Sequence, residues 1–176
     1  MKLIGPIIAT LITASSAAAQ TDCTVSFDVI TAKDHGAIAA GSVLKGTVTF
    51  TANEEYRQDV ETLSYLSNGT TQLTAADGTQ VTGNIGVVHV VRTPYTADYI
   101  SIDATGVTGN LGGVGSYEDP MLVTLYAAPL TLETSALPAT PDDWSLLSKR
   151  RMFQVHTPDT MAILPGTIEN LTGSCE

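Results

Sequence analysis

Three histidines are the residues of this chain whose chemistry could most directly support catalysis: His35, His89 and His156. A Ser-His-Asp device also needs a serine nucleophile, but no G-x-S-x-G segment is present, and the nearest string, Gly113 to Tyr117, has a different spacing. No histidine lies in an H-x-H or H-E-x-x-H pattern, so the sequence offers no zinc site. We predict that His89, within Val-Val-His-Val-Val, is a core residue satisfied by a neighbour, and that His35 is exposed.

Carboxylates could act in pairs or bind a cation. Adjacent pairs occur at 54–55, 118–119 and 142–143, but 18 acidic residues make such adjacency expected by chance, so no glycosidase pair is indicated. Calcium takes several loop oxygens, and its best place is the loop with Asp103, Glu118 and Asp119, with Asp98 as a further candidate. A solvated acidic rim is the interpretation that we favour. The sequence identifies no catalytic or cofactor-binding residue, and calcium is the one cofactor that it leaves open.

Residues 106–115 are unusually rich in glycine. Glycine loops that bind phosphate need a following helix or a lysine, whereas here Ser116 to Pro120 lead into another strand. Two interpretations remain. The segment is a mobile connection, or it is a recognition loop that presents Tyr117 on a rigid scaffold.

The N-terminus has the three parts of an export signal. Lys2 precedes an uncharged, mostly apolar stretch from Leu3 to Ala14, and small residues follow as far as Ala19. The stretch is shorter than the roughly 20 residues that span a membrane. We predict that residues 1–19 are a cleaved signal peptide, with an uncleaved anchor as the alternative. Residues 20–176 then form a single domain that is secreted or periplasmic and not inserted in a membrane.

Two cysteines, Cys23 and Cys175, lie near the two ends of this domain. In an oxidising compartment a pair is expected to form a disulfide, and here only one pairing exists. A redox or metal pair is the alternative, but the C-x-x-C spacing is missing.

The composition limits the partners. The chain carries 8 basic and 18 acidic residues, and loss of Lys2 changes the formal charge from −10 to −11. Such a surface repels nucleic acid and anionic lipid. A protein or a glycan surface remains as a partner, and the oligomeric state stays open.

Apolar and polar residues alternate with period two between the cysteines, as in strands with one buried face. Asn68-Gly69 is the strongest hairpin signal, and Asp77-Gly78 is a second. Eight to ten short strands separated by turn residues predict an all-β fold, an antiparallel β-sandwich, with a β-barrel as the alternative. The strand runs begin at Val25, Leu44, Leu63, Gly86, Tyr99, Met121, Met152 and Met161.

Two segments have helical signals. Thr140 and Pro141 form an N-terminal cap, Asp143 lies in the first turn, and 149–151 are basic, which predicts a turn or two over 141–148 with some of Trp144, Leu146 and Leu147 packed inward. A short helix near Asn53 and a loop are equally compatible with the residues there.

Three functions fit these features. The leading hypothesis is an exported, non-enzymatic binding module that contacts a partner or surface through its loops. The second is a structural subunit of a surface assembly that pairs through an exposed strand edge. The third is a secreted hydrolase whose site assembles only in the fold.

Overall fold

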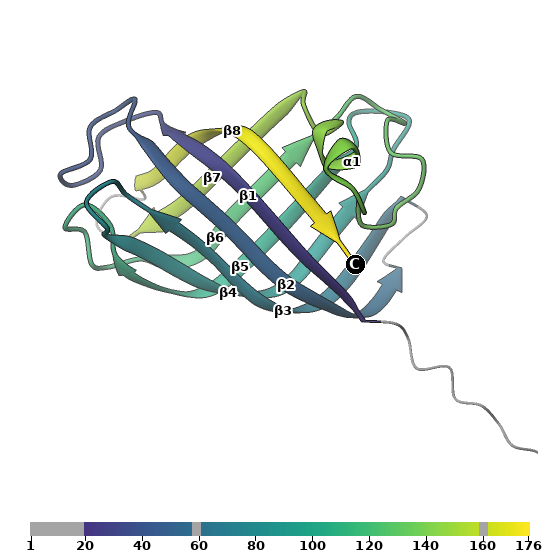
Figure 1. The fold of residues 1–176 in the computed structure, drawn as a ribbon, viewed down its shortest axis with the longest axis horizontal. Helices are drawn as coiled ribbons and strands as arrows, with labels where there is room; N and C mark the ends of the chain where they lie inside the picture. The colour runs from purple at the N-terminus through teal and green to yellow at the C-terminus, as the bar shows by residue number, and fades with distance from the viewer. Residues whose placement is uncertain (1–19, 58–60, 159–161) are drawn as a thin grey trace, which may run out of the picture.

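Eight antiparallel strands form one closed up-and-down barrel in the computed structural model, which describes residues 20–57, 61–158 and 162–176 (Figure 1). The predicted signal peptide lies outside the described residues. Among the described residues, no helix has the length and apolar character needed to cross a membrane. The elements are β1 Thr21–Thr31, β2 Val43–Arg57, β3 Thr62–Thr74, β4 Gln80–Val91, β5 Tyr99–Asn110, β6 Glu118–Tyr126, α1 Pro141–Ser145, β7 Arg150–Thr157 and β8 Ala162–Cys175.

The all-β prediction is confirmed, but the sandwich is wrong and the alternative, a barrel, is right. Each strand pairs with the next one in the chain, and β8 returns to pair with β1 from Thr31↔Gly166 to Cys23↔Cys175. Sandwich and barrel strands share the same alternation, because both bury one face. The pairing of the first strand with the last is what separates them, and no local pattern encodes it.

Side chains fill the barrel interior, as the width of an eight-stranded barrel allows. In β1 the odd-numbered residues from Cys23 to Thr31 are buried, whereas the even-numbered ones face outward. The largest fully buried side chains include Phe153, Leu44, Ile100 and Trp144. The alternation in the sequence is therefore the inside–outside alternation of the barrel wall.

The Asn68-Gly69 hairpin prediction is wrong, because both residues lie inside the continuous strand β3. The register of β3 on β4 shifts between Leu66 and Gly69. A Cβ atom on Gly69 would collide with the Thr49 carbonyl oxygen and with Phe50. The glycine thus marks a close approach of two backbones. The Asp77-Gly78 turn is confirmed: Gly78, with φ +83°, lies in the turn between β3 and β4.

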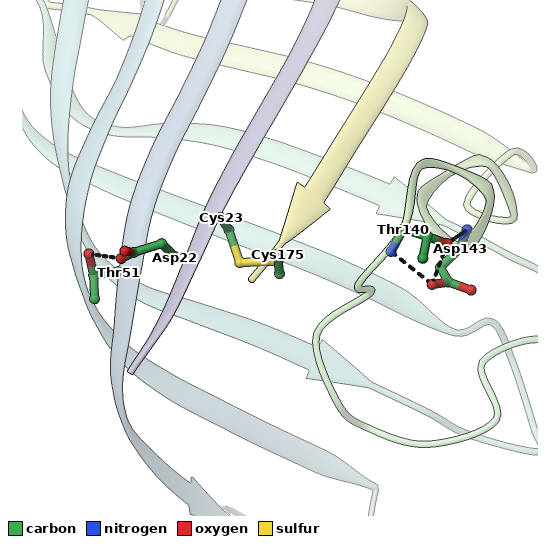
Figure 2. Close-up of a disulfide and its surroundings, with 6 residues drawn as sticks. All are labelled: Asp22, Cys23, Thr51, Thr140, Asp143 and Cys175. Carbon is green, nitrogen blue, oxygen red and sulfur yellow. Dashed lines mark hydrogen bonds between the residues drawn. A yellow bond between two sulfur atoms is a disulfide. The ribbon is translucent and has the colours of Figure 1, made fainter. Parts of the chain in front are cut away.

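The helix prediction is confirmed, with α1 ending three residues earlier than expected. The Thr140 hydroxyl accepts from the Asp143 N–H, and the Asp143 carboxylate accepts from the Thr140 N–H, which is a capping box (Figure 2). Trp144 and Leu147 are buried and Leu146 is exposed. Arg151 donates to the carbonyl oxygens of Leu147 (2.6 Å) and Ser145 (3.2 Å) at the end of the helix. Near Asn53, by contrast, the chain is strand, because β2 continues to Arg57.

Residues 127–149, which connect β6 to β7 and include α1, form what we call the capping segment. The indole of Trp144 packs on β8, where a Cβ atom on Gly173 would lie about 2.9 Å from the ring. The Cys175 N–H donates to the Ala139 carbonyl oxygen, and the Tyr65 hydroxyl donates to the Ser135 carbonyl oxygen. The segment therefore closes one end of the barrel by contacting strands on both sides of it.

The predicted disulfide between Cys23 and Cys175 is present, with 152 residues of sequence separation (Figure 2). The two cysteines lie directly opposite each other in the β1–β8 pair. An intramolecular disulfide fits a protein of an oxidising compartment such as the periplasm or the extracellular medium.

Candidate functional site

Tyr117, the predicted recognition residue, directs its hydroxyl into the protein. The hydroxyl donates to the Val114 carbonyl oxygen (2.8 Å) and accepts from the Leu111 N–H (3.2 Å). The Nε2 atom of His35 lies 3.2 Å from the same oxygen, and burial raises the pKa of the phenol. These are the contacts of a structural residue. Recognition by Tyr117 stays a prediction that its contacts do not support.

The glycine-rich segment belongs to a set of interlocked turns at the barrel end opposite the capping segment. Residues 106–110 are part of β5, and 111–114 form a tight turn. The Ala37 N–H donates to the Gly112 carbonyl oxygen (2.7 Å), and the Gly112 N–H donates to the Thr79 hydroxyl (3.0 Å). The turns after β1, β3 and β5 thus hold one another.

The calcium candidates have separate partners. Asp103 accepts a hydrogen bond from the Ser101 hydroxyl (2.6 Å), and Asp119 accepts one from the Val107 N–H (2.9 Å), which lowers the pKa of Asp119. Glu118 is exposed and pairs through its backbone with β7. Among the described residues, no three or more His, Cys, Asp or Glu side chains gather closely enough to hold a metal. Calcium binding there stays a prediction that this arrangement does not support.

The histidine predictions fail at two positions. His35 was expected at the surface but is only 9% exposed, and burial, with a smaller effect from Lys33, lowers its pKa below the ordinary 6.5. His89 was expected in the core but is half-buried on the outer face of β4, between Ser64 of β3 and Ser101 of β5. The expectation that a neighbour satisfies it is confirmed, because its Nδ1 lies 2.8 Å from the Ser64 Oγ. His156 is half-buried near the end of β7.

Ser64 and His89 are the nucleophile and base types that a hydrolase combines, at hydrogen-bond distance. The Ser64 side chain, however, has an exposed fraction of 0%. A substrate carbon could reach its Oγ only after the neighbouring strands or side chains moved. The local pattern could not have identified the pair, because cross-strand register brings the two residues together.

Asp98, the further calcium candidate, is fully buried and uses both carboxylate oxygens on backbone donors. Its Oδ1 accepts from the N–H of Thr93 (2.9 Å) and of Leu130 (3.1 Å), and its Oδ2 accepts from the Leu132 N–H (2.8 Å). Thr93 belongs to the β4–β5 loop, whereas Leu130 and Leu132 belong to the capping segment. The carboxylate therefore fixes two loops against each other.

Two large side chains are presented by the loops that Asp98 joins. Tyr95 is 82% exposed and Leu130 is 51% exposed. Leu130 has φ +57°, in the left-handed region that costs a residue with a Cβ about 1–2 kcal/mol. Asn170, at φ +49°, is of a type that tolerates this conformation; leucine is not. An exposed apolar side chain and a left-handed backbone thus coincide at Leu130.

A groove of about 350 Å³ lies in the capping segment, and its lining begins at Thr131, the residue after Leu130 in the chain. Leu132, Leu137 and Pro138 give it an apolar lining, and Leu146, 46% exposed, is at its border. Glu133 and Asp143 add carboxylates to the same lining. We call Leu130, Leu146 and this groove, together with Tyr95 of the loop that Asp98 joins to the capping segment, the capping face. It is the candidate functional site.

No motif in the sequence indicates the capping face. Tyr95 lies in no recognisable pattern, and a leucine in the left-handed region has no signal in the sequence. One feature of the sequence could have indicated this site, namely the length of the connection between β6 and β7. It has 23 residues, whereas most connections between elements have about 4–6. Long loops of that kind are often functional.

Comparison of the chain with protein-family models, with curated proteins and with solved structures finds no match.

Proposed function

We propose that the protein is an exported, non-enzymatic binding module whose capping face contacts a protein partner. The partner segment combines an apolar side chain, which lies against Leu130 and the groove, with basic residues. Export is supported by the apolar N-terminal stretch of the sequence and by the disulfide.

The conformation of Leu130 carries this proposal. Glycine or asparagine would occupy φ +57° at lower cost, so leucine at this position makes sense if its side chain has a use. The side chain is not used in the core, because half of it is exposed. Backbone strain that the surrounding structure holds in place is commonly found at sites of function.

Charge selects the kind of partner. Glu133 and Asp143 line the groove, and the neighbouring Asp142 is exposed. The whole chain is strongly acidic, with a formal charge of −10. Complementary potential speeds association and disfavours acidic partners, so a basic segment fits this face best.

Leu130→Asn is the variant that tests the proposal, because asparagine keeps the left-handed backbone and removes the apolar side chain. Peptides from a random display library would be selected on the mature protein and their affinities measured by calorimetry. We expect selected peptides to pair an aromatic or aliphatic residue with Lys or Arg, and to lose about tenfold in affinity on L130N, about 1.4 kcal/mol. Val43→Thr removes another exposed apolar side chain, on β2, and should leave the affinity unchanged.

The proposal is wrong if no peptide is enriched, if the enriched peptides are acidic, or if L130N binds as tightly as the parent. Equal losses of peptide affinity in L130N and V43T would show that the peptides adhere unspecifically to exposed apolar side chains. Self-association that depends on Leu130 would identify a second copy of this chain as the occupant, which also contradicts a basic partner.

A hydrolase is the second candidate, because the Ser64 Oγ lies 2.8 Å from the His89 Nδ1. Pure protein would be tested on chromogenic esters, together with Ser64→Ala and His89→Gln. Turnover that both variants abolish would favour the hydrolase over the binding module. The burial of Ser64 makes us expect no turnover.

Assembly through a strand edge is less well supported than loop-mediated binding. β1 and β8 pair along most of their length, so neither the first nor the last strand offers a free edge of full length. An added strand would have to separate two strands that are already paired.

A further inference from the structure

Basic residues cluster in one short stretch of this acidic protein, at the start of β7. Three of its eight basic residues are consecutive, Lys149, Arg150 and Arg151. Lys149 and Arg150 are exposed, and neither has an ion-pair partner in the part of the chain that the structure describes. Lys45, by comparison, is 2.6 Å from the Asp28 carboxylate. Two uncompensated cations thus lie side by side in the sequence at the start of β7.

These cations line a cleft of about 350 Å³ between β7 and β8. The β7–β8 pairing begins only at Met152↔Thr167, so β7 residues before Met152 lie beyond the paired region. Arg151 is turned toward the capping segment, because it donates to the carbonyl oxygens of Leu147 and Ser145. The cleft therefore extends from the last paired residues of the two strands to the unpaired start of β7.

The rest of the lining is mainly apolar. Met152 and Pro165 are half-buried, and Ala32 joins the lining from the end of β1 through a hydrogen bond of its N–H to the Pro165 carbonyl oxygen (2.9 Å). The exposed hydroxyl of Thr167 is the neutral polar side chain of the lining. Small-molecule sites typically combine such apolar walls with a few polar or charged groups, in volumes of about 300–1,000 Å³.

We propose that this cleft binds a small organic carboxylate with an apolar body. Lys149 and Arg150 would bind the carboxylate, since guanidinium and ammonium groups form charge-assisted hydrogen bonds with it. The apolar body would lie against Met152, Pro165 and Ala32. An overall charge of −11 after signal cleavage repels anions in general, so two neighbouring cations without an ion-pair partner among the described residues are what makes this cleft selective for one.

The probes are 4-phenylbutyrate and its neutral counterpart 4-phenylbutanamide, titrated into the 15N-labelled mature protein. We expect saturable amide shifts for the acid at Lys149 to Phe153 and at Gly166 and Thr167, and much weaker shifts for the amide. The double variant Lys149→Gln, Arg150→Gln should lower the affinity for the acid about tenfold or more. Both side chains are exposed, so the fold should persist.

Lys45→Gln is the matched control, because it removes one positive charge from β2 and leaves the cleft intact. It should change the affinity less than twofold. The site is absent if the acid gives no saturable shifts, if the shifts lie elsewhere, or if the amide binds equally well. It is also absent if the double variant binds like the parent, or if K45Q loses as much affinity as the double variant. The capping face does not enter this experiment, so either proposal can fail without the other.

Discussion

Three backbone N–H groups, from Thr93, Leu130 and Leu132, donate to the buried carboxylate of Asp98. A buried carboxyl group is tolerated when such donors replace the hydrogen bonds that water would make. In the sequence Asp98 is one of 18 acidic residues and drew attention as an oxygen ligand for calcium. In the structure the oxygens of Asp98 accept hydrogen bonds from the backbone of two loops instead. These bonds account for an acidic residue at a position with no access to solvent.

Asp98→Asn should destabilise the protein by about 2–3 kcal/mol, because the amide NH₂ would face an N–H donor and leave it unpaired. Urea unfolding monitored by the fluorescence of Trp144, the one tryptophan of the chain, would measure the loss. Asp142→Asn changes an exposed carboxylate and should stay within about 0.5 kcal/mol. A D98N variant as stable as the parent would show that the three donors find other partners.

His35 should make stability depend on pH. Its pKa lies below the ordinary 6.5 in the folded protein, mainly through burial, so the unfolded chain binds the proton more readily. The stability due to neutral His35 is therefore complete above pH 6.5 and decreases as the pH falls from there through the folded pKa. His35→Gln should lose less stability than the parent between pH 7 and 5 in urea unfolding. His156→Gln is the matched control, and equal pH profiles for H35Q and the parent would contradict the prediction.

At the scale of elements, most short-range signals predicted the local structure, whereas the pairing of the strands could not be predicted. The cap at Thr140, the turn at Asp77-Gly78 and the inward alternation of β1 depend on residues close in sequence. The barrel closure and the Ser64–His89 contact depend on register between strands. The Asn68-Gly69 pair led to a wrong hairpin prediction, because the glycine is needed where two strand backbones approach closely and not for a turn.

The β1–β8 pair is the element whose disulfide can be tested directly. Cys23→Ala, Cys175→Ala should destabilise the barrel by about 2–5 kcal/mol, because the bond restrains a loop of 152 residues in the unfolded chain. The same loss should follow when the parent is unfolded with a reductant present, and the reductant should not affect the double variant. If the double variant is as stable as the oxidised parent, the backbone pairing of β1 with β8 suffices to close the barrel.

At the scale of the molecule, the all-β class could be predicted from the sequence, whereas the candidate site could not. The fold class is predicted from composition and from an alternating pattern over many residues, so a wrong interpretation of one residue does not change the prediction. The capping face depends on one backbone conformation at Leu130 and one buried carboxylate. The two barrel ends also differ: interlocked turns close one end, and a long segment with exposed apolar side chains closes the other.

The joined chain ends have a practical consequence for experiments. Asp22 and Glu176 exchange two backbone hydrogen bonds, so the start of β1 and the end of β8 lie at one point of the barrel, on the side of α1 (Figures 1 and 2). A tag attached just before Gln20 or after Glu176 would therefore hold the protein by the side that carries the capping face. A circular permutant that joins Glu176 to Gln20 through a short linker and opens the chain at Asp77-Gly78 would move both ends to the opposite side. Such a permutant could be immobilised with the capping face turned toward the solution.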